Sequence, residues 1–298
     1  MSVEAQPIAP VDEIAEAGVR SPLQLAAEQF FRHRLAVAGL VIIVVMVLAA
    51  LLAPYISDYQ PNKPNLREKL HPPSTEFLFG TDHFGRDVFT RTLYGARVSL
   101  LVGLGVVLIA AGIGTPLGVI SGFFGSWLDN LIMRLMDAFL TFPPLLLAVA
   151  VMGTLGPATQ NVTLAIGLVY IPVFARLARG STLNLREATY VSASVALGAS
   201  NWRIISRDVF PNIAGVMIVL VAITFSRAVV AEAALSFVGL GVQPPTPSWG
   251  RDLQEARRYL EEAWWLVTFP TVMIAGAVLS MSFVGDGLRD ALDPRTRR

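Results

Sequence analysis

Few residues in this 298-residue chain could carry out covalent or metal chemistry. There is no cysteine, which excludes a thiol nucleophile and a Cys-based zinc site. The three histidines, His33, His71 and His83, are isolated and form no H-E-x-x-H motif. Neither lysine, Lys63 or Lys69, lies in the G-x-x-x-x-G-K-[ST] loop that binds nucleotide phosphates. With no G-x-S-x-G motif either, we expect no enzyme active site, no cofactor and no metal.

Two charged residues, Arg227 and Glu232, interrupt the apolar run at 212–237. Ionisable groups inside a membrane segment are costly and usually face a cavity or a partner. One interpretation is that they line a pore or a subunit interface. The other is that they form an ion pair that only stabilises the helix bundle.

The polar segment at 179–211 has the pattern of two short helices joined by a glycine. Residues 185–197 favour a helix, and Gly198 can adopt the left-handed conformation that ends it. Ser200 is a suitable cap for a second helix reaching about Phe210, and Pro211 suits the first turn of the next helix. The segment is either an ordinary loop with two surface helices or a knob that docks on a soluble partner.

The elements that would position these residues are long uncharged helices. Hydrophobic residues make up 54% of the chain and charged residues 15%, with a mean hydropathy of +0.58. A bilayer core of about 30 Å needs roughly 20 apolar residues per helix. The uncharged runs predict six spans, at 35–53, 98–124, 134–155, 162–178, 212–237 and 264–285. Pro143 and Pro144 predict a kink or break in the third span. The glycines of the second span suit close packing in lipid: Gly103, Gly105, Gly112, Gly114 and Gly118.

Six spans place both termini on one side of the membrane. With the N-terminus inside, the inner segments hold 13 arginines and lysines and the outer segments 9. This bias favours cytoplasmic termini and an external 57–97 loop, although that loop carries six of the nine outer charges.

The 179–211 segment resembles the loop signature of binding-protein-dependent ABC transporter permeases. That signature is Glu-Ala-Ala, three residues, Gly, nine residues and Ile-x-Leu-Pro. Aligned on Gly198 and Pro211 it fits without a gap, but Ser192, Ser194 and Asp208 replace the usual Glu, Ala and Ile. A charge contact from the usual Glu is therefore missing.

Other stretches are similar to the peptide/nickel permease subfamily, namely 80–88 (GTDHFGRDV), 94–100 (YGARVSL), 233–250 and 285–295. The resemblance covers residues 28–295. A single span followed by a long external loop is similar to the C-type member of a pair of unlike permeases.

The resemblance implies an all-α integral membrane protein with the type I ABC importer permease fold. It implies a flexible cytoplasmic tail at 1–27, a transmembrane helix and external loop at 28–95, and a permease domain at 96–292. The loop at 179–211 would dock on an ATPase through a defined set of residues: Tyr190, Ala193, Leu197, Gly198, Ala199, Arg203 and Pro211.

The implied partners are a homologous second permease, two ABC ATPase subunits and an extracytoplasmic solute-binding protein, in the inner (plasma) membrane. Peptides or nickel would cross between the two permeases, and ATP would be hydrolysed by the partner chains. The net charge of +1 gives no sign of nucleic-acid binding. A stand-alone secondary transporter or channel is the alternative, although it should show inverted repeats, which we do not find. A membrane-embedded enzyme is a third alternative, but the predicted spans contain no group of histidines, cysteines or paired carboxylates that could act in catalysis.

Overall fold

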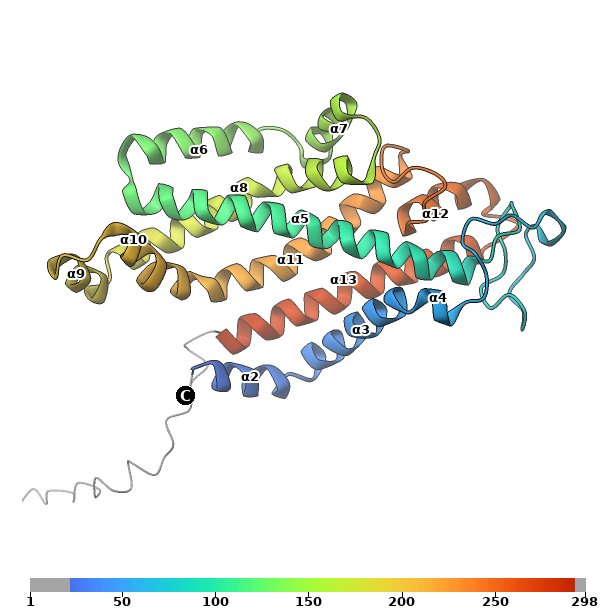
Figure 1. Cartoon of the computed structure of the whole chain (residues 1–298), viewed down its shortest axis with the longest axis horizontal. Coiled ribbons are helices and arrows are strands. Elements are labelled where there is room, and N and C mark those ends of the chain that lie inside the picture. Colours follow the sequence, from blue (N-terminus) through green and yellow to red (C-terminus); the bar gives the residue numbers. More distant parts are fainter. Residues whose placement is uncertain (1–21, 293–298) are drawn as a thin grey trace, which may run out of the picture.

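A computed structural model describes residues 22–292 of the chain (Figure 1). Five helical segments in this part are long and apolar enough to cross a membrane, which confirms five of the predicted positions. They are α3 (Arg34–Leu51), α5 (Val88–Phe124), α8 (Thr159–Arg186), α11 (Phe210–Phe237) with the turns before it, and α13 (Trp265–Leu292). No strand occurs within the described range, in agreement with the all-α prediction.

The third predicted span is two helices rather than one. α6 (Ser126–Leu140) and α7 (Pro144–Leu155) meet at an angle of 91° across a break of three residues. Pro144 occupies the first turn of α7, where its missing N–H leaves no hydrogen bond unmade. The predicted break at the proline pair is confirmed, and the pair makes a sixth crossing only if both bent halves are counted together.

α5 and α8 pack along most of their lengths because α5 presents glycines to the α8 backbone. A Cβ built on Gly114 would lie 2.5 Å from the Ile171 carbonyl oxygen, and one on Gly118 only 2.2 Å from that of Ala175. Lipid gives no hydrophobic drive to helix association, so close backbone contact must supply it. Gly112 was wrongly included in this set, because no atom outside the adjacent backbone of its own helix lies within 4 Å of its Cβ position.

The N-terminal helices lie against α13. In α3, a Cβ on Gly39 would lie 2.5 Å from the Ser280 carbonyl oxygen, so the two backbones touch. The short helix α2 (Pro22–Arg32) precedes α3 and also contacts α13. Residues 22–27, predicted as part of a flexible tail, are therefore helical. The rest of that predicted tail, 1–21, lies outside the described residues.

The two ends of the helix bundle carry different short elements (Figure 1). One end gathers α4 (Ala53–Ile56), the 3-10 turn η1 (Leu66–Glu68), α12 (Trp249–Ala256) and the 3-10 turn η3 (Arg257–Tyr259). The opposite end carries α9 (Thr189–Ala196) and α10 (Asn201–Ile204), and a π-helical turn, η2 (Ile205–Val209), joins α10 to α11. The described chain also starts and stops toward the α9 end, which agrees with six crossings when the bent pair α6 and α7 is counted as one span.

Candidate functional site

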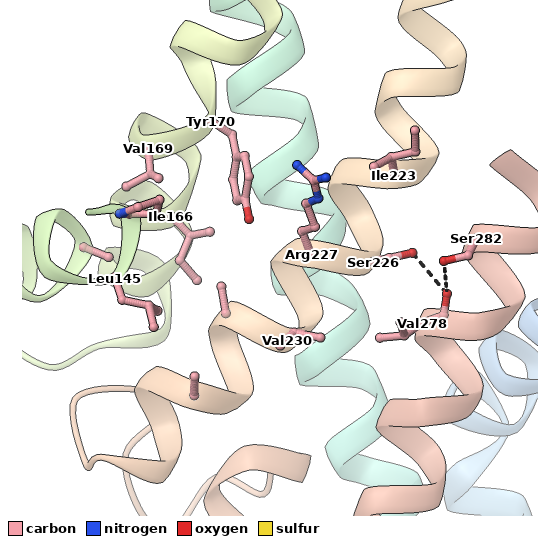
Figure 2. A pocket seen from close by; sticks show the side chains of 14 residues that line it. Leu145, Ile166, Val169, Tyr170, Ile223, Ser226, Arg227, Val230, Val278 and Ser282 are labelled. Carbon is pink, nitrogen blue, oxygen red and sulfur yellow. Dashed lines mark hydrogen bonds between the residues drawn. The ribbon is translucent and has the colours of Figure 1, made fainter. Parts of the chain in front are cut away.

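A cavity of about 530 Å³ opens between α7, α8, α11 and α13 (Figure 2). Its walls are mostly apolar, and several of the side chains that form them are exposed in this chain: Leu145 (49%), Ile223 (37%) and Val230 (48%). Concave, mostly apolar pockets between the helices of a bundle are common binding sites for small molecules. The cavity is therefore the candidate path for a solute.

Polar groups enter this cavity from three helices. Ser226 of α11 and Ser282 of α13 both donate hydrogen bonds to the Val278 carbonyl oxygen, at 3.2 and 2.8 Å, so their hydroxyl protons are already used. Figure 2 shows the Tyr170 hydroxyl of α8 and the Arg227 guanidinium of α11 extending into the same space. Arg227 is exposed there and forms no ion pair with any carboxylate of residues 22–292.

Glu232 lies in different surroundings, although it belongs to the same helix. It is fully buried, and its carboxylate accepts hydrogen bonds from Ser99 Oγ at 2.9 Å and Ser236 Oγ at 2.7 Å. The Trp249 backbone N–H also reaches Ser99 Oγ, at 3.4 Å, which connects α12 to this group. The ion-pair interpretation for Arg227 and Glu232 is wrong. Arg227 lines the cavity, and Glu232 joins α5, α11 and α12.

At the α12 end, charged residues far apart in the sequence form one buried network. Arg86 binds Asp82 at 2.6 Å and Glu255 at 2.7 Å, and Arg91 donates to Asp252 Oδ1 from Nε at 3.1 Å. The arginine side chains are only 8% and 4% exposed. Buried ion pairs hold their partners in place because breaking one leaves a charge unpaired. The network fixes the 80–88 segment onto α12.

The same place contains a possible metal-binding geometry. Ligand atoms of Asp82, His83 and Glu255 all lie within 4.8 Å of one another. Arg86, however, already pairs with both carboxylates, so a cation there would compete with a guanidinium that cannot be deprotonated. These residues fit an ion-pair network better than a metal site.

Burial and neighbouring charges shift the titration of this network. Burial raises the pKa of Glu255, but Arg91 and Arg86 outweigh it and hold the pKa below its usual 4.5. Burial also lowers the pKa of His83 below 6.5, despite the opposing charges of Asp82 and Glu255. His83 therefore remains neutral near pH 7, stacked on Tyr259 with the ring centroids 5.1 Å apart.

At the other end, α9 and α10 form a knob whose outer side chains are exposed. Val191, Ile204 and Val209 anchor it in a buried cluster with Phe174 of α8. Leu197 is 88% exposed at its tip, and Gly198 follows with φ +77°, which confirms the predicted left-handed turn.

The structure places each predicted docking residue on or beside this knob. Tyr190, Ala193, Leu197, Gly198, Arg203 and Pro211 are exposed, and Ala199 is half-buried. Ser200 occupies the N-cap position of α10, as predicted, although its side chain makes no capping hydrogen bond. The predicted end of the second helix is wrong, because this helix does not stop at Phe210 but continues through η2 into α11.

Sequence reasoning missed two exposed apolar residues of the knob, Val195 (58%) and Trp202 (66%). Both are large apolar side chains in a segment otherwise polar enough for water, which is a usable signal of a binding surface. The Trp202 ring also makes an edge contact with Phe124 at the end of α5, with centroids 6.4 Å apart. The knob thus touches the end of α5 as well as α8 and α11.

Comparisons with known proteins agree with this architecture. Residues 114–298 match the family model described as "Binding-protein-dependent transport system inner membrane component". Residues 21–73 match the "N-terminal TM domain of oligopeptide transport permease C". The first match covers more than half of the chain.

Curated relatives align over nearly the whole length. The chain is 44% identical to a dipeptide transport system permease protein of Alkalihalophilus pseudofirmus, over 93% of this chain and 91% of that protein. It is 43% identical to a di/tripeptide transport system permease protein of Pseudomonas aeruginosa, over 93% of each. A chain of the inward-facing MetNI methionine ABC transporter shares the fold, with a TM-score of 0.57 and 19% identity, over 68% of this chain and 97% of that one.

Proposed function

The chain belongs to the family of binding-protein-dependent transport system inner membrane components, and from this membership we propose that it is one of two permeases of an ATP-driven importer of short peptides. The names of its relatives support peptides as the solute, since dipeptide and di/tripeptide permeases align with it over more than 90% of their lengths. Nickel is a solute of the wider subfamily and remains the second candidate.

The exposed cavity wall is the observation that carries this proposal. Leu145 and Val230 are about half exposed, and Arg227 stands beside them within a membrane-spanning bundle. In lipid the charge of Arg227 would be unfavourable, and in water the exposed apolar side chains would be, so this wall fits neither surroundings alone. A second, homologous permease facing this wall would close it into a path for an amphipathic solute.

The knob at the α9 end supplies a place for a soluble ATPase. Its exposed Leu197, Tyr190 and Trp202 can enter an apolar groove in the way a helix binds a cleft. We place this end in the cytoplasm of a cell with an inner membrane, together with both termini, because the positive charges favour that side. The α12 end would then meet the solute-binding protein outside.

Reconstitution tests the division of labour. The chain is placed in liposomes with a homologous second permease, two ABC ATPase subunits and a solute-binding protein, and uptake of di- and tripeptides is measured with and without ATP. Uptake should need ATP and every subunit, and the chain alone should hydrolyse no ATP. Uptake by the chain alone, driven by an ion gradient, would show a secondary transporter instead.

Topology has its own test. Reporter fusions at Gln60 and at the C-terminus should report opposite sides of the membrane, with the C-terminus cytoplasmic. Equal cytoplasmic signals at the two positions would contradict the orientation.

A further inference from the structure

Arg227 is a cation inside the cavity, and no carboxylate of the described residues forms an ion pair with it. It lies ten residues before the end of α11, or about 15 Å along the helix axis, which is near mid-depth of a bilayer. A charge at that depth is costly unless it meets water or an opposite charge. No described carboxylate pairs with it, and the nearest acidic residue on its own helix, Glu232, is fully buried and bonded to serines.

The geometry points to Arg227, with Tyr170 beside it, as a binding site for the carboxylate of the solute in transit. This inference rests on the proposed function and names the solute's chemistry at that site. A guanidinium offers two parallel N–H donors that match a carboxylate, and a tyrosine hydroxyl can donate a third hydrogen bond. The serines of the cavity do not compete, because their protons already bind the Val278 carbonyl oxygen.

The rest of the cavity fits the remainder of such a solute. A volume of about 530 Å³ and walls of Leu, Ile, Val and Ala accept variable apolar side chains without selecting among them. The positive charge also repels free metal cations, since no lining residue is acidic. The importer should therefore carry peptides with a free carboxyl end and reject uncomplexed Ni²⁺.

The chain contains no cysteine, so one introduced cysteine gives a unique thiol in it. Substituting Arg227 by cysteine removes the positive charge, and a charged thiol reagent can then restore or reverse it. Arg227→Cys is assembled with its partners, placed in liposomes and tested for uptake of a mixture of free-acid dipeptides, read by mass spectrometry. Aminoethyl methanethiosulfonate then adds a cation to the thiol, and sulfonatoethyl methanethiosulfonate adds an anion. Gln60→Cys, an exposed position outside the cavity, is the control, and the unmutated importer shows any effect on cysteines of other subunits.

Arg227→Cys should lose uptake by about tenfold or more, the equivalent of one charged hydrogen bond. The cationic reagent should restore much of it and the anionic reagent none, while Gln60→Cys should show no dependence on the sign of the added charge. Assembly of the importer should not change. The solute concentration for half-maximal uptake should not change either, because the binding protein captures the solute.

Three results with the variant would overturn the inference while leaving the proposed function intact. They are full uptake by Arg227→Cys, equal effects of the two reagents, and poor assembly of Arg227→Cys, which would assign Arg227 to a carboxylate of the partner permease. Import of radiolabelled Ni²⁺ alone by the unmutated complex at peptide-like rates would also overturn it. If the unmutated complex imports no dipeptide at all, the peptide proposal itself fails.

Discussion

Arg227 and Glu232 are five residues apart on α11, about 1.4 turns of helix, and share no partner among the described residues. The first faces the solute cavity, and the second is buried between α5 and α12, where Ser99 and Ser236 donate hydrogen bonds to it. Two charges that look like a pair in the sequence therefore have separate tasks. Substitution of Arg227 should affect transport, and substitution of Glu232 should affect stability.

A double-mutant cycle separates these tasks. Glu232→Ala leaves two buried serine hydroxyls without an acceptor and should lower the free energy of unfolding by about 2 kcal/mol. Arg227→Gln, at an exposed position without an ion pair, should change it by less than about 0.5 kcal/mol. The double variant should show the sum of both, measured by unfolding in detergent. A coupling of about 1 kcal/mol or more would mean that the two side chains do interact.

Gly198 tests the knob through its backbone conformation alone. Apart from its chain neighbours, no atom lies within 4 Å of its Cβ position, so a side chain meets no clash, but φ is +77°. Gly198→Val should cost about 1–3 kcal/mol at this turn and misdirect α10, whereas Gly198→Asn should be tolerated. We expect the valine variant to insert and pair with the second permease but to lose ATPase association and ATP-driven uptake. Normal uptake by Gly198→Val would reduce the segment to a simple connector.

Gly118 and Gly112 provide a matched test of the α5–α8 contact. Alanine at Gly118 would place its Cβ 2.2 Å from the Ala175 carbonyl oxygen, while alanine at Gly112 enters open space. Gly118→Ala should lower the midpoint of thermal unfolding in detergent by several degrees. Gly112→Ala should leave it unchanged or raise it slightly, since alanine favours helix over glycine by about 1 kcal/mol. Equal effects of the two variants would rule out close backbone packing as the cause.

His83 should make the α12 end sensitive to mild acid. Burial lowers its pKa below 6.5, so once the pH falls below 6.5 the unfolded chain binds a proton more readily than the folded one. The stability of this end should fall as the pH drops from 6.5 toward the lowered pKa. His83→Phe keeps the stacking on Tyr259 and should flatten this dependence, as followed by thermal unfolding between about pH 7.5 and 5.5. A slope unchanged by His83→Phe would assign the effect to other groups.

The positions of the membrane helices could be read directly from the sequence, because a span in lipid must satisfy its own backbone and so appears as a long uncharged run. The break at Pro143 and Pro144 and the turn at Gly198 are equally local, since each follows from the conformations that one residue type allows. The peptide-permease resemblance also came from the order and spacing of residues, and the comparisons confirm the family.

The tertiary structure alone decided which side chains meet. Arg86 and Glu255 are 169 positions apart and pair only because α12 folds back over the start of α5. Gly118 touches α8 whereas Gly112 does not, since a helix rotates its residues away from any one neighbour. The same rotation sends Arg227 into the cavity and Glu232 away from it. Periodicity gives the angle between two side chains on one helix, but only packed neighbours determine what lies in each direction.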